Sequence, residues 1–136
     1  MAKILIIEDE TEVRSLLARR LNSHHFETLE AGDADTGLLQ AKEGKPDLVI
    51  LDLQLPGQDG LQIYRSLRKE ETMKQVPVLF LTAISTGVGS LTKEGLGLIA
   101  SAKHGFKLTG DFEVMTKPYD AKRLIDTLKG MLPPDA

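Results

Sequence analysis

The stretch DLVILDLQLPGQDG at residues 47–60 joins an uninterrupted apolar run to one acidic residue and then to a turn-forming segment. The run from Leu48 to Leu51 is short and rich in branched side chains, which predicts a β-strand buried on both faces. Asp52 ends this strand, and Pro56–Gly57 and Asp59–Gly60 are typical turn pairs. The stretch therefore places a carboxylate on a rigid strand end, directly before a loop.

Comparable apolar runs recur along the chain and alternate with amphipathic stretches. The other expected strands are Ile4–Ile7, the half-exposed edge strand Phe26–Ala31, Val78–Leu81 and Phe112–Met115. The expected helices are marked by Val13, Leu16, Leu17 and Leu21; by Ala34–Lys42, with Asp33 as cap and Gly44 as stop; by Leu61, Tyr64 and Leu67; by Leu91, Leu98, Ile99 and Ala102; and by Leu124, Ile125, Leu128, Met131 and Leu132. Five strands alternating with five helices predict an α/β fold with a parallel sheet covered on both faces.

The connection between the last two strands differs from the others. Half of the chain's 12 glycines lie between Ala83 and Asp111. Each glycine inside a helix weakens it by roughly 1 kcal/mol relative to alanine. We therefore expect one fraying helix with mobile flanks in this segment.

Composition excludes several classes of protein. A chain of 136 residues fits one domain, and the absence of cysteine excludes disulfides, thiolate metal sites and cysteine nucleophiles. A net charge of −3 and an aromatic content of 4% do not favour nucleic-acid binding. The apolar runs are too short for a membrane span, and the N-terminus has no leader-like apolar region. These features predict a cytoplasmic protein that binds neither nucleic acid nor membrane.

Polar residues follow four of the five expected strands. They are Glu8 and Asp9, Asp52, Thr82 and Lys117. Because parallel strands end at the same edge of a sheet, we expect these side chains to converge there. Clustered carboxylates favour a hard divalent cation, and Mg2+ needs only one or two of them, such as Asp9 and Asp52 with Glu8 nearby.

This arrangement suits transfer of a phosphoryl group to a protein carboxylate. Asp52 would be the nucleophile, since its carboxylate is accessible but held on a rigid strand end. Lys117 and the cation would neutralise charge on the transferred group, and Thr82 could donate a hydrogen bond to a phosphoryl oxygen.

The whole chain resembles the receiver domain of two-component response regulators, the family of the chemotaxis response regulator. The resemblance rests on four motifs in the right order: ILIIEDE at residues 4–10, DLVILDLQLPGQDG at 47–60, VPVLFLTA at 76–83 and MTKPYD at 115–120. It implies a flavodoxin-like, doubly wound five-stranded parallel sheet of order 2-1-3-4-5, with an enlarged fourth crossover. Residues 1–132 would form the receiver domain, and residues 133–136 a tail or the start of a linker.

The resemblance also implies a function and a set of site residues. A sensor histidine kinase would phosphorylate Asp52, with Mg2+ bound by Asp9, Asp52 and the backbone carbonyl of Gln54, and with Glu8 in support. Thr82 is similar to the family's switch hydroxyl, and Lys117 to its phosphate-contacting lysine. The Lys117–Pro118 peptide would be cis, as is common in the family. Phosphorylation would switch a face that binds a downstream partner, an output domain in a longer protein, or a second copy as a dimer.

Two features depart from the family's pattern. The family usually has an aromatic residue where this chain has Val114, and Phe112 lies two positions earlier, on the same face of the strand. The segment from Thr82 to Lys117 is also longer than usual.

The positions that tune phosphoryl lifetime in the family are Gln54 and Ile84 here, and an apolar Ile84 predicts slow loss of the phosphoryl group.

A signalling module, not an enzyme, is the main hypothesis, but two alternatives remain. The first is a docking module whose phosphorylation site is vestigial, which the two departures motivate. The second, flavin binding, is disfavoured by the carboxylates where a phosphate would lie. We interpret His24–His25 as an exposed loop and the residues from Arg65 to Lys69 as a solvated helix face.

Overall fold

The computed structural model describes residues 1–55, 57–83 and 91–133. Its centre is a five-stranded parallel sheet of order β2-β1-β3-β6-β7. These strands are β1 (Lys3–Ile7), β2 (Glu27–Ala31), β3 (Leu48–Asp52), β6 (Val78–Thr82) and β7 (Phe112–Thr116). Numbered among themselves, they follow the predicted order 2-1-3-4-5.

Burial explains why these segments form strands. Every residue of β3 and β6 is buried, whereas the edge strand β2 has only exposed and half-buried residues before Ala31. Continuous apolar runs are typical of strands covered on both faces, and alternating runs are typical of edges. The sequence interpretation of both kinds of strand is confirmed.

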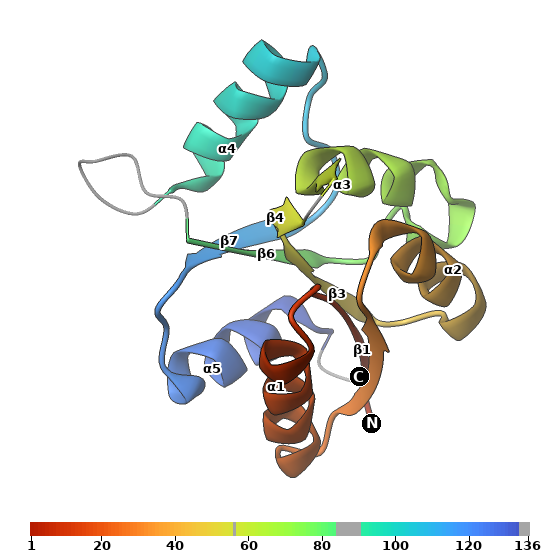
Figure 1. Cartoon of the computed structure of the whole chain (residues 1–136), viewed down its shortest axis with the longest axis vertical. Coiled ribbons are helices and arrows are strands. Elements are labelled where there is room, and N and C mark those ends of the chain that lie inside the picture. Colours follow the sequence, from red (N-terminus) through yellow and green to blue (C-terminus); the bar gives the residue numbers. More distant parts are fainter. Residues whose placement is uncertain (56, 84–90, 134–136) are drawn as a thin grey trace.

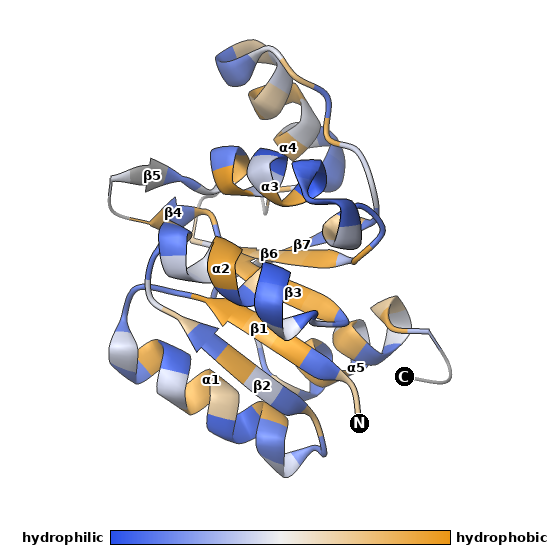
Figure 2. Cartoon of the chain, turned by 90° about the vertical axis from the view of Figure 1, so that its right-hand side faces the viewer, coloured by the Kyte–Doolittle hydropathy of each residue, from blue (hydrophilic) through white to orange (hydrophobic). Residues whose placement is uncertain are grey.

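Helices cover both faces of the sheet (Figure 1). One face packs against α1 (Thr11–Ser23) and α5 (Ala121–Met131). The other packs against α2 (Ala34–Gly44), α3 (Gly60–Lys69) and α4 (Lys93–Ile99) with its π-helical continuation η2 (Ala100–His104). Figure 2 shows the apolar strands enclosed between these layers. No helix in the described ranges has the length and apolar character that a membrane span requires.

Short additional elements join the main ones. The loop after β3 contains a two-stranded antiparallel hairpin of β4 (Gln54–Leu55) and β5 (Gln58–Asp59), and a 3-10 turn, η1 (Glu71–Met73), follows α3. The hairpin replaces the loop that was expected after Asp52. Asp59, expected in a turn, is the N-cap of α3, because its Oδ1 accepts a hydrogen bond from the Leu61 N–H at 2.9 Å.

The caps of α2 were predicted partly correctly. Asp33 is the N-cap, with its Oδ1 2.8 Å from the Thr36 N–H. Gly44 was expected to stop the helix but lies within it, and Lys45 is the left-handed residue, with φ of 48°. A Cβ on Gly44 would lie 2.4 Å from Leu29 Cδ1, so this glycine permits close packing on the sheet edge.

Two predicted apolar stripes were wrong in detail. On α1, Leu17 and Leu21 are buried, but Val13 and Leu16 are exposed. Beyond β6, Leu91 is buried as expected, but Leu98 and Ile99 face outward and the buried helical residues are Leu96 and Ala100. The helix begins only at Lys93, so Leu91 lies before it and does not set the phase of its apolar stripe; Leu96 and Ala100, four residues apart, form the inward face.

Arg68 corrects the interpretation of Arg65–Lys69 as a solvated helix face. Its guanidinium donates hydrogen bonds to four backbone carbonyls, those of Met73, Val76, Thr109 and Asp111, at 2.6–3.0 Å. It also lies over the Tyr64 ring, 4.6 Å from the centroid. Arg68 therefore fixes the return of the fourth crossover to β7.

Candidate functional site

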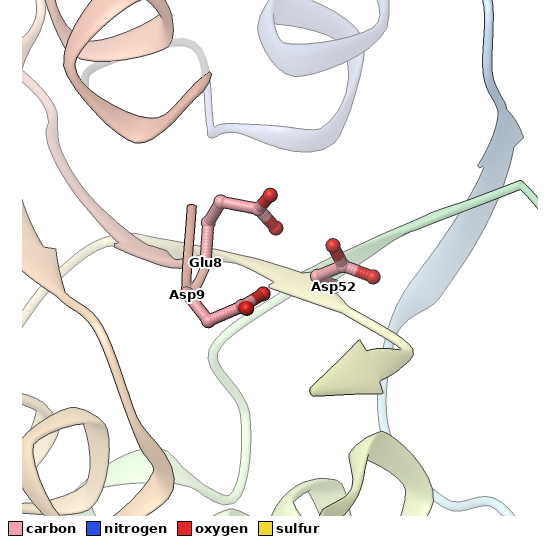
Figure 3. Close-up of side chains that lie close together, drawn as sticks. All are labelled: Glu8, Asp9 and Asp52. Carbon is pink, nitrogen blue, oxygen red and sulfur yellow. The ribbon is translucent and has the colours of Figure 1, made fainter. Parts of the chain in front are cut away.

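Three carboxylates meet at the edge where the strands end. Glu8 and Asp9 follow β1 and Asp52 ends β3, and one oxygen from each lies within 4.8 Å of the others. Figure 3 shows these three side chains close together at the ends of the strands. Glu8 and Asp52 are buried, so the Asp52 carboxylate is less exposed than the sequence suggested. The neighbouring parallel strands β1 and β3 thus bring together residues far apart in sequence, as predicted.

The Asp52 carboxylate has a defined partner on each oxygen. Oδ1 accepts a hydrogen bond from the Gln54 backbone N–H at 2.8 Å, and Oδ2 lies 3.2 Å from the Lys117 Nζ. The Asp52 side chain is 8% exposed and that of Lys117 is 30% exposed. One carboxylate oxygen of Asp52 therefore faces the Lys117 ammonium group, and the main chain fixes the orientation of the carboxylate through the other.

The last two strands position Lys117 and Thr82. Thr82 ends β6 opposite Thr116 of β7, and the Lys117 backbone N–H donates to the Thr82 carbonyl at 2.8 Å. Thr82 is fully buried. The Lys117–Pro118 peptide is cis, as the resemblance implied. Four of the five strand ends thus supply the predicted polar residues to one edge.

The site perturbs the protonation of two of its members. Burial, together with the hydrogen bond and negative charge of Asp52, raises the pKa of Glu8 from its ordinary 4.5 to about 8. Burial acts to lower the pKa of Lys117, but the carboxylates of Asp52 and Glu8 outweigh it and raise that pKa. Three carboxylates facing one ammonium group leave the site with excess negative charge, which favours either a proton or a cation.

The donor set fits Mg2+. Three carboxylate oxygens within 4.8 Å of one another are hard ligands of the kind that Mg2+ prefers. Asp9, which is half-buried, and Asp52 are the carboxylates that resemble the family's metal ligands. Gln54 begins β4 next to them, and its side chain is exposed.

Two residues of the site were missed in the sequence. Arg14 in α1 donates from Nη1 to the Glu8 backbone carbonyl at 2.7 Å and so holds the acidic pair in place. Gly60 allows α3 to begin beside Asp52, because a Cβ there would lie 2.7 Å from Leu53 Cα and 3.0 Å from the Asp52 carbonyl. Arg14 belongs to no recognisable sequence motif. The Asp59–Gly60 pair was noted in the sequence but was interpreted as a turn.

Other predicted residues lie as follows. Phe112 and Val114 both pack on the α3 side of the sheet, and Phe112 makes edge contacts with Tyr64 and Phe80 at centroid distances of 6.0 Å. His24 and His25 are exposed at the end of α1, as expected. Ile84 lies outside the described residues.

The raised pKa of Glu8 predicts how stability depends on pH when metal is removed. Between pH 4.5 and about 8, Glu8 keeps its proton in the folded protein but loses it in the unfolded chain. The folded state then binds more protons, so the free energy of unfolding should fall as pH rises through this window. Urea unfolding in EDTA should reveal the fall, and Glu8→Gln should remove it.

Glu12→Gln is the matched control, because Glu12 is an exposed glutamate of α1. This variant should retain the pH dependence of the unsubstituted protein. An equal fall in Glu8→Gln would contradict the assignment to Glu8.

Comparison with known proteins adds a family match. Residues 4–129 match the family model of the response regulator receiver domain. The chain is 32% identical over 130 residues to the phosphate regulon transcriptional regulatory protein PhoB of Escherichia coli (strain K12), covering 96% of this chain and 51% of that protein. It is 30% identical over 130 residues to the alkaline phosphatase synthesis transcriptional regulatory protein PhoP of Bacillus subtilis (strain 168), covering 96% of this chain and 48% of that protein. The chain thus spans about half the length of these relatives.

Solved structures agree on the fold. The chemotaxis protein CheY4 of Vibrio cholerae is 23% identical, with a TM-score of 0.79 and coverage of 97% of this chain and 99% of that one. The BeF3-activated N-terminal receiver domain of RstA from Klebsiella pneumoniae is 28% identical, with a TM-score of 0.71 and coverage of 95% and 97%.

Proposed function

The chain belongs to the response regulator receiver domain family of two-component signalling, and from this membership and the site geometry we propose that it is switched by phosphorylation of Asp52. The observation that carries the proposal is the Lys117 Nζ at 3.2 Å from an Asp52 oxygen, beside the carboxylates of Glu8 and Asp9. A mere helix-capping aspartate would need neither the half-buried lysine nor the acidic neighbours.

In the proposed step, an Asp52 oxygen attacks the phosphorus atom of the donor. The new bond joins that oxygen to phosphorus, and the bond from phosphorus to the donor's leaving atom breaks. The electron pair of the broken bond stays with the leaving atom. A phosphohistidine donor is then released as neutral imidazole after protonation, and acetyl phosphate releases acetate. The product is an acyl phosphate on Asp52.

The chain's own residues would orient this reaction and stabilise its charge. The Gln54 N–H fixes the Asp52 carboxylate, and the Lys117 ammonium lies where negative charge accumulates on the phosphoryl oxygens. Asp9, Asp52 and the Gln54 carbonyl would hold Mg2+, with Glu8 in support. When bound, Mg2+ supplies neutralisation of phosphoryl charge.

The proposed signalling role follows from the product. A phosphoryl group brings close to two negative charges and three acceptor oxygens next to Lys117, while the Asp52 carboxylate loses its own charge. Thr82 at the end of β6 would donate a hydrogen bond to one of these oxygens. A sensor histidine kinase is the proposed donor in the cytoplasm, and a downstream protein or output domain the proposed reader.

Intact mass after incubation with acetyl phosphate and Mg2+ tests the proposal. We expect a single phosphoryl adduct on the unsubstituted chain, its loss in EDTA, and no adduct on Asp52→Asn, which retains the size and shape of the side chain. Asp35→Asn is a matched control, since Asp35 lies in the exposed first turn of α2. It should be modified like the unsubstituted chain.

Two results would contradict the proposal. An adduct that persists on Asp52→Asn would place the phosphoryl group elsewhere. Absence of any adduct, together with partner binding that ignores phosphodonor and Mg2+, would favour the docking module instead.

A further inference from the structure

The fourth crossover contacts the Asp52 loop through one polar cluster. Asp59 Oδ2 lies 2.8 Å from the His104 Nε2 and 3.0 Å from the Lys103 Nζ, while its Oδ1 caps α3. The His104 Nδ1 is 3.0 Å from the Gln62 side-chain amide. The tautomer protonated on Nε2 satisfies both contacts, because Nε2–H donates to Asp59 and Nδ1 accepts from Gln62. We refer to Asp59, Lys103 and His104 as the crossover cluster.

Partial burial and hydrogen bonds hold the crossover cluster in place. The His104 side chain is 11% exposed and that of Asp59 is 24% exposed. Burial acts to raise the pKa of Asp59, but the hydrogen bonds from the Leu61 N–H, His104 and Lys103 hold that pKa below its usual value. The π-helical turn η2 brings two adjacent residues, Lys103 and His104, onto the same carboxylate.

A cavity lies beside the crossover cluster. Its volume is about 390 Å³, with Leu53 and Gln54 of the loop on one side and Leu96 and Ile99 of the crossover on the other. Figures 1 and 2 show α4 beyond α3, at the end of the molecule away from α1. The polar cluster therefore joins the crossover to the loop next to this cavity.

A continuous set of bonds leads from Asp52 to this cluster. The Asp52 Oδ1 accepts from the Gln54 N–H, and Gln54 is paired with Asp59 across the β4–β5 hairpin. Asp59 in turn binds His104 and Lys103. Conversion of the Asp52 carboxylate to an acyl phosphate removes its charge, which weakens the Gln54 hydrogen bond whichever oxygen reacts. The hairpin is therefore the first main-chain element to respond.

We propose that His104 is a positioning residue that, with Lys103, couples the hairpin to α4, so that phosphorylation of Asp52 is transmitted to the exposed face of α4 through Asp59. The inference rests on the proposed function, since phosphorylation is the input. The inference assigns the coupling between Asp52 and α4 to side chains of the fourth crossover. Coupling through such a network is reciprocal and needs a direct measurement.

A fluorophore on α4 measures the coupling. The chain has no cysteine, and Leu98 is 72% exposed on α4, so Leu98→Cys gives a single labelling site. We expect acetyl phosphate with Mg2+ to change the fluorescence as the mass adduct forms. His104→Leu should retain the adduct but reduce the fluorescence change at least about threefold. His104→Gln, which keeps an N–H donor for Asp59, should restore most of the change.

Two lysines of the crossover provide a matched pair. Lys103→Met removes the ion pair to Asp59, whereas Lys93→Met removes the ion pair to Glu113 on β7, where the two charged atoms are 3.4 Å apart. Only Lys103→Met should reduce the fluorescence change. Equal reductions in both would indicate general loosening of α4 and would overturn the route.

The outcomes separate this inference from the proposed function. An adduct on the labelled chain without a fluorescence change, or an unchanged response in His104→Leu, overturns the coupling but leaves phosphorylation of Asp52 intact. Absence of an adduct overturns the proposed function itself, and the coupling with it.

Discussion

Lys117→Met is expected to slow phosphorylation of Asp52 by acetyl phosphate about 100-fold, the usual effect of removing one charge-stabilising group from a reacting centre. The Lys117 Nζ lies 3.2 Å from Asp52 Oδ2 and is the cation that the described residues place against that carboxylate. Methionine keeps an unbranched side chain of similar length, so the apolar part of the side chain is largely retained. The loss is therefore one of charge.

The rate of adduct formation, measured by intact mass at saturating Mg2+, checks this prediction. Lys122→Met is the control, because Lys122 lies on α5 with its side chain 89% exposed and paired to Asp126. It should react at the unsubstituted rate. A Lys117→Met rate within about twofold of the unsubstituted rate would exclude a role for this ammonium in the transfer.

Arg68→Met should destabilise the protein by about 2–3 kcal/mol. Its guanidinium donates to the carbonyls of Met73, Val76, Thr109 and Asp111, two of them from Nη1 alone. Tyr64 also donates its hydroxyl to the Thr109 carbonyl, and Gly110, with φ of 83°, permits the close approach of the Arg68 side chain. Methionine would leave these carbonyls without their charged donor.

Equilibrium unfolding in urea measures this loss. Arg65→Met is the matched substitution in the same helix, since Arg65 lies over the Phe106 ring at 5.2 Å and is exposed. We expect it to change the free energy of unfolding by less than about 1 kcal/mol. Equal losses for the two variants would show that the carbonyl contacts of Arg68 contribute little.

The crossover cluster and Arg68 share a property that explains why they escaped sequence interpretation. Asp59 binds residues 44 and 45 positions later, and Arg68 binds carbonyls 41 and 43 positions later. No local periodicity reports such pairs. An arginine on a polar helix face is normally solvated, and only the return path of the chain turns it into a structural centre.

The strands, their parallel arrangement and the polar residues at their ends can all be predicted from the sequence. Continuous apolar runs such as Leu48–Leu51 can be buried only inside a covered sheet, and parallel strands must end at one edge. Asp52, Asp9 and Lys117 could therefore be grouped before any coordinates were known.

The position of the fourth crossover, by contrast, depends on tertiary contacts. Its glycines and weak helical stripe left the buried face open, and Leu96 and Ala100, not Leu98, are the residues that pack inward. The π-helical turn then directs Lys103 and His104 onto Asp59. A short, glycine-containing helix has too little intrinsic preference to fix its own position, so contacts with distant residues determine it.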